Sequence, residues 1–97
     1  MTESLPSLRD IRMDGKRLRW WVNAEGETCL LREDSSEWFS VVGRVTRGTQ
    51  GEYTGVSSLF SPGYTHSFTI ESIAAGWLLH ALQNRGVLLY GVSAVDL

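Results

Sequence analysis

The sequence predicts an α+β domain in which an antiparallel sheet of about four to six strands carries one main helix on one face. The first observation is a stretch, residues 69–86, whose apolar residues from Ile70 to Leu82 recur at helical spacing. The second is a series of shorter runs before it that alternate apolar and polar residues. The third is that glycine-containing turn sequences separate these runs. One helix covers one face of a sheet, so we expect two layers.

The predicted helix has signals at both ends. Thr69 is expected to cap the first turn through its hydroxyl, and Glu71 places a carboxylate near the positive end of the helix dipole. Arg85 and Gly86 fit the other end, where a cation and a left-handed residue are favoured.

The first strands are predicted at residues 8–13, 17–23 and 27–32. Asp14-Gly15 is a tight-turn sequence, and Asn23 to Gly26 fits a type I turn with glycine in the left-handed position. The second turn sets a register that places Trp21 opposite Cys29, Arg19 opposite Leu31, Trp20 opposite Leu30, Val22 opposite Thr28, Arg17 opposite Glu33 and Lys16 opposite Asp34. Opposite charges on facing residues favour this register.

The rest of the chain is less regular. Further strands are predicted, in chain order, at residues 37–47, 55–60, 64–68 and 87–95. Gly43 interrupts the first of them and indicates a bulge or a crossing point. The last is apolar almost throughout, which is typical of a strand buried on both sides. Residues 48–68 form a long connection of the kind that is often functional.

Composition narrows the class of protein. The 97 residues suit a single domain, with residues 1–7 expected to be a loose end. The formal charge of −2 gives the whole domain no attraction to nucleic acid or an anionic membrane. Cys29 is the single cysteine, so no internal disulfide is expected, and no signal peptide or membrane span is evident. These two features predict a cytoplasmic protein. Arginine outnumbers lysine eight to one, which suggests a GC-rich bacterial or phage gene.

The predicted strands carry more apolar surface than one helix can cover. The face expected under the helix comprises Leu18, Trp20, Val22, Leu30, Phe39, Val41 and Val45. The opposite face is expected to present Trp21, Cys29, Leu31, Trp38 and Val42, rimmed by Arg17, Arg19 and Arg44. Tryptophan and arginine dominate binding hot spots, and exposed apolar patches of a few hundred Å² mark interaction sites. We therefore predict a protein-binding surface there.

Other interpretations of that face remain open. The 48–68 connection, with Tyr53, Phe60 and Tyr64, would make the face ordinary core if it folded over it. A second copy of the chain would cover it in a homodimer. Stacked bases would suit Trp21 and Trp38 in a single-stranded nucleic-acid binder, against which the net negative charge counts.

Candidate chemistry is sparse. His66, Ser67 and Thr69 precede the helix and would hold a phosphate, carboxylate or nucleotide if they gathered at its N-terminus. Cys29 is expected to be a packing residue, not a nucleophile, and the histidines lack metal-ligand spacing. No cofactor and no catalytic residue is predicted.

The sequence thus favours a non-enzymatic protein-binding domain. Its small size and acidic charge are typical of bacterial or phage inhibitors, such as anti-defence, anti-CRISPR-like or immunity proteins. The alternatives are a small-anion module, a homodimeric structural protein and a nucleic-acid binder.

Overall fold

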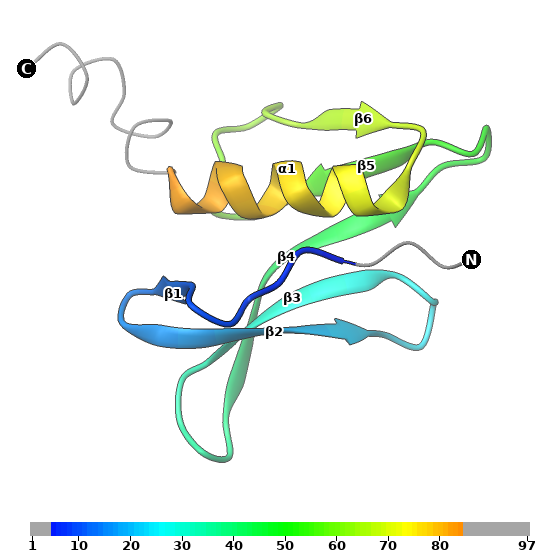
Figure 1. Ribbon diagram of the computed structural model, residues 1–97. Helices are drawn as coiled ribbons and strands as arrows, with labels where there is room; N and C mark the ends of the chain where they lie inside the picture. The colour runs from blue at the N-terminus through cyan, green and yellow to red at the C-terminus, as the bar shows by residue number, and fades with distance from the viewer. Residues whose placement is uncertain (1–4, 85–97) are drawn as a thin grey trace, which may run out of the picture.

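The computed structural model of the protein describes residues 5–84. It confirms the α+β prediction: six antiparallel strands form one curled sheet, and one helix packs on it (Figure 1). In chain order the elements are β1 Arg12–Met13, β2 Lys16–Val22, β3 Thr28–Glu33, β4 Phe39–Arg47, β5 Tyr53–Val56, β6 His66–Phe68 and α1 Glu71–Gln83. Neighbours in sequence are neighbours in the sheet, whose strand order is β1-β2-β3-β4-β5-β6.

The β2–β3 hairpin has the predicted register. Trp21 pairs with Cys29 and Trp20 with Leu30. The turn between the strands explains this, because Gly26 adopts a φ of 80° and its amide donates to the Asn23 carbonyl at 3.0 Å. The Asn23 side chain also accepts hydrogen bonds from the amides of Glu25 and Glu27.

The predicted ion pairs across this hairpin are partly different. Lys16 lies 3.9 Å from Asp34, as expected. Glu33 pairs with Arg19 at 3.9 Å, and not with Arg17.

A bulge in β4 changes which residues face the helix. Leu30 pairs with Gly43 but Leu31 pairs with Val41, so Val42 is an extra residue on β4. Side chains before the bulge therefore swap sides relative to a regular strand. Val42 turns into the core under the helix, and Val41 turns to the opposite face, which corrects the predicted side of both.

The helix is shorter than predicted at its start. Its N-cap is Ile70, which makes no side-chain capping bond, so the prediction that Thr69 caps the helix is wrong. Glu71 does lie in the first turn, where it accepts a hydrogen bond from the Thr28 hydroxyl at 3.1 Å. The predicted C-terminal signals at residues 85 and 86, and the strand at residues 87–95, lie outside the described residues.

The core lies between α1 and one face of the sheet. Its fully buried side chains include Leu30, Val45, Leu78 and Leu82. Gly43 lets the helix approach closely, since a Cβ there would lie 2.9 Å from Leu78 Cδ1. Gly43 is thus the crossing point that its position in the sequence indicated.

The N-terminal segment and the 48–68 connection also pack on the helix side. Leu5 contacts the core, and the Pro6 carbonyl accepts a hydrogen bond from the Trp20 indole at 2.9 Å. Phe60 is buried in the same core, where its ring meets Tyr64 edge-on at 5.4 Å. These segments do not cover the second face of the sheet, so the interpretation of that face as ordinary core closed by the connection is wrong for the described chain.

Candidate functional site

The face of the sheet turned away from α1, here called the open face, is built by the register of β1 to β5. Alternation along each strand and pairing across strands place the following side chains on it: Arg12, Arg17, Arg19, Trp21, Cys29, Leu31, Glu33, Phe39, Val41, Arg44 and Val56. One row runs straight across the sheet from Trp21 through Cys29 and Arg44 to Val56.

The open face has an exposed apolar centre. Trp21 is 48% exposed, Val41 54% and Phe39 38%. Cys29 and Leu31 lie between them on the central strand β3 and are buried. Trp21 on β2 and Val41 and Phe39 on β4 thus flank β3 on the same face, and large apolar side chains that remain this accessible on one face are of the type that marks interaction sites.

Arginines dominate the charge of the open face. Arg19 pairs with Glu33 and also lies over the Phe39 ring, 5.2 Å from its centroid. Within residues 5–84, Arg17 and Arg44 have no ion pair. The open face is therefore positive although the chain as a whole is negative.

A hollow at the β1 end of the face gathers several of these arginines. It has a volume of about 510 Å³ and is lined by Leu8, Arg9, Arg12, Arg17, Leu18, Arg19 and Glu33. Arg12 Nη1 donates to the backbone carbonyls of Arg9 and Ile11 at 3.3 and 3.2 Å, which holds its guanidinium at this corner. Glu33 is the single carboxylate among the lining residues.

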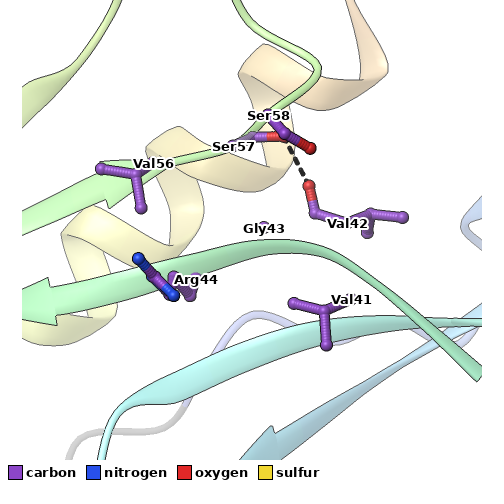
Figure 2. Close-up of a pocket in the computed structure, with 7 residues that line it drawn as sticks. All are labelled: Val41, Val42, Gly43, Arg44, Val56, Ser57 and Ser58. Atoms are coloured by element: carbon purple, nitrogen blue, oxygen red, sulfur yellow. Dashed lines mark hydrogen bonds between the residues drawn. The ribbon is translucent and has the colours of Figure 1, made fainter.

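A second hollow opens where β5 leaves β4. Figure 2 shows the side chains around it, and its volume is about 390 Å³. β5 pairs with β4 only from Arg44 to Arg47, and beyond Val56 the chain turns away. The Ser57 hydroxyl then donates a hydrogen bond to the Val42 carbonyl at 2.6 Å (Figure 2). A side chain therefore satisfies this carbonyl where β5 no longer pairs with β4.

The structure brings most of the predicted surface together, with two exceptions. Arg17, Arg19, Trp21, Cys29, Leu31 and Arg44 share the open face. Val42 is in the helix-side core, because of the bulge. Trp38 is 68% exposed but lies in the hairpin connection before β4, and no ring contact joins it to Trp21.

Sequence reasoning missed Arg12, Phe39 and Val41 on this face. Phe39 and Val41 were assigned to the helix side by unbroken alternation along β4, and the bulge reverses that assignment. Gly43 was the signal that could have found them, because a glycine inside a strand often accompanies a bulge.

The residues proposed for an anion site do not converge. His66 and Ser67 are consecutive in β6, so they point to opposite sides of the sheet. The His66 ring contacts Phe68 and Trp77, and Ser67 shares a hydrogen bond with Thr54 at 2.7 Å. At the helix start Glu71 already places a carboxylate in the first turn, which disfavours a second anion there.

The chemistry of Cys29 fits a packing role. Burial, and secondarily the nearby Glu27 carboxylate, raise the pKa of the thiol above its ordinary value, which leaves less thiolate for nucleophilic attack. Across residues 5–84, no three potential metal ligands come together. Among residues 5–84, no helix combines the length and the apolar character needed to cross a membrane.

The chain matches no protein-family model, no curated protein and no solved structure.

Proposed function

We propose that this protein is a non-enzymatic binding domain whose open face docks against another protein. The observation that carries the proposal is the apolar centre formed by Trp21, Phe39 and Val41, exposed on a sheet face that no described segment covers. Leaving such a patch in water is unfavourable by about 25 cal/mol per Å² of apolar area. A partner surface that removes it from water recovers that free energy.

The side chains around this centre suit a protein partner. Tryptophan and arginine are enriched in binding hot spots, and Trp21 and Arg44 lie in one row across the face. Arg19, held over Phe39 and beside Glu33, presents a partly organised guanidinium, which reduces the entropy lost on binding.

A domain of 97 residues with one such face has the build of a small inhibitor, which acts by covering a functional surface of its target. We therefore extend the proposal to an inhibitor of bacterial or phage origin that works in the cytoplasm. This extension rests on the small size of the domain and on the exposed apolar centre of the open face.

A single-stranded nucleic acid is the competing ligand for an arginine-rich face with aromatic rings. Two features count against it: the chain carries a formal charge of −2, and Arg19 already lies over the Phe39 ring. We expect no binding of an unstructured oligonucleotide at low salt. If the oligonucleotide did bind, and its affinity fell steeply with added salt, the open face would be a nucleic-acid site and the protein-binding proposal would be wrong.

The test is site-specific photo-crosslinking from the open face. A benzoylphenylalanine introduced at Val41, exposed on the open face, in the full chain should form a discrete crosslink to a protein in an extract of the source cells. The matched control carries the same group at Glu25, exposed in the β2–β3 turn and off the face. A crosslinking pattern that is identical at the two positions would refute the proposal.

A second arm separates binding from folding. Trp21→Ala should lose the partner and change the free energy of unfolding by less than about 1 kcal/mol, because the side chain is half exposed. Trp20→Ala is the folding control, since this neighbour faces the core and bonds to Pro6. A loss of stability without a loss of partner in Trp21→Ala would make the face part of the core.

A further inference from the structure

Arginines converge at the β1 end of the open face with little to neutralise them. Arg9, Arg12, Arg17 and Arg19 line one hollow of about 510 Å³, together with a single carboxylate, that of Glu33. Glu33 already pairs with Arg19 at 3.9 Å. Neither Arg9 nor Arg17 has a carboxylate partner among residues 5–84.

Such a cluster costs the free protein energy. Like charges about 8 Å apart at a wet surface repel by roughly 0.5 kcal/mol per pair, and arginine stays charged at every physiological pH. The backbone holds part of the cluster in place, since Arg12 donates to two main-chain carbonyls. The repulsion is relieved when an anion enters the hollow.

We infer that this arginine hollow binds an acidic segment of the partner protein, one that presents at least two carboxylates to Arg9, Arg12 and Arg17. The inference rests on the proposed function and adds the chemistry of the partner to it. The hollow adjoins the apolar centre, so one partner surface reaches both: an apolar part covers Val41 and Phe39, and an acidic part enters the hollow.

Carboxylates are favoured over nucleic-acid phosphates by the surroundings of the hollow. The apolar centre beside it calls for a partner with apolar side chains, which a phosphate backbone does not supply.

The experiment titrates the full chain at low salt with a synthetic hexaglutamate peptide and follows amide chemical shifts by NMR. We expect the largest shifts at Arg9, Arg12 and Arg17, and binding that weakens as salt is added. Arg17→Gln should weaken binding about tenfold, which corresponds to roughly 1.4 kcal/mol. Arg47→Gln is the matched control, because Arg47 lies on β4 outside the open face; it should bind as the wild type does.

A second readout separates a ligand site from a structural one. Arg17→Gln and Arg9→Gln remove repulsion, so each should raise the melting temperature of the free chain by roughly 2 to 4 °C while weakening the peptide complex. A lower melting temperature in both would mean that the arginines serve the fold, and would overturn the inference.

Further results of the titration would also overturn the inference. Shifts spread evenly over the surface, or an oligonucleotide that binds in the hollow while hexaglutamate does not, overturn the acidic-segment inference. So does a free chain whose hollow proves to be filled by its own residues or by a second copy. If the hollow fails in any of these ways while the probe at Val41 still crosslinks to a partner, the inference alone falls and the proposed function stands.

Discussion

Cys29 shows how a single residue on the open face depends on its neighbours. The thiol is buried, its cross-strand neighbour is Trp21, and burial raises its pKa. We expect slow reaction with a thiol reagent at pH 8 in the native chain, and a rate about tenfold higher in Trp21→Ala, because removing the indole exposes the sulfur.

Kinetics with a chromogenic disulfide reagent would measure this. Trp38→Ala is the control, since Trp38 lies in the hairpin connection and should leave the rate unchanged. Equal rates in wild type and Trp21→Ala would show that the indole does not shield the thiol.

Asp34 joins two hairpins through its carboxylate. It accepts hydrogen bonds from the Ser40 hydroxyl and from Arg32 Nε, and Arg32 Nη1 also reaches Asp14 at 2.8 Å. The Ser40 hydrogen bond first, and then the Arg32 contact, lower the pKa of Asp34 from its ordinary value of 3.8. A carboxylate with a lowered pKa stabilises the fold above its ordinary pKa, and this contribution is lost as pH falls through the lowered value.

The resulting prediction concerns acid sensitivity. Asp34→Asn should unfold at lower denaturant than wild type at pH 7, and the difference should shrink as the pH falls below 3.8. Glu37→Gln, an exposed change in the same connection, is the control and should show no such convergence. Denaturant titrations at several pH values measure it; a difference that is constant with pH would contradict the assignment.

At the scale of elements, the crossing of α1 over β4 depends on a missing side chain. A Cβ on Gly43 would lie 2.9 Å from Leu78 Cδ1 and 3.2 Å from Leu82 Cδ1, and both leucines are fully buried. Gly43→Ala should therefore destabilise the fold by about 1 to 3 kcal/mol through overpacking.

Gly76→Ala is the matched control, with the opposite expected sign. In the middle of α1 a Cβ at this position would meet only Pro6 Cγ, at an ordinary 3.8 Å. Alanine should stabilise the helix by about 0.5 to 1 kcal/mol. Thermal unfolding of both variants measures the difference, and equal effects would refute the close approach at Gly43.

The elements also show how far a sequence alone can be taken. The β2–β3 register was predictable because a turn with glycine at its left-handed position determines which residues pair. The sides of the sheet that Val41 and Val42 face were not predictable in this way, because one extra residue in β4 reverses the side of every residue before it. The start of the helix was not predictable either. Thr69 is a good capping residue, but the helix begins one residue further along the chain, so that Ile70 is its N-cap.

The residues of the open face likewise divide into those that the local sequence predicts and those that it does not. Trp21 and the arginines of β2 were placed correctly because they lie in the β2–β3 hairpin, whose turn can be predicted from the sequence. Phe39 and Arg12 were missed because their sides depend on a bulge and on a two-residue strand. The packing of Leu5, Pro6 and Phe60 on the helix side is a long-range contact that no local pattern encodes.

At the scale of the whole molecule, the distribution of charge decides how the open face associates. A two-fold dimer would set this face against its own copy. From the part of the chain that the structure describes, each copy contributes Arg12, Arg17, Arg19 and Arg44 to this face and one carboxylate, that of Glu33, so like charges would meet around the apolar centre. We therefore expect sedimentation to show a 10.8 kDa monomer at micromolar concentration.

Charge reversal turns this into a direct test of the open face. A chain carrying Arg17→Glu and Arg44→Glu keeps the exposed Trp21 and Val41 but presents carboxylates around them. Mixed with wild type in equal amounts at low salt, it should associate more strongly than either chain alone, because the apolar centres can then meet with opposite charges around them. A mixture with Arg47→Glu, whose change lies outside the face, should stay monomeric. A wild-type dimer that Trp21→Arg dissociates would instead show that the face is used for self-association, since the apolar contact would then outweigh the repulsion among the arginines.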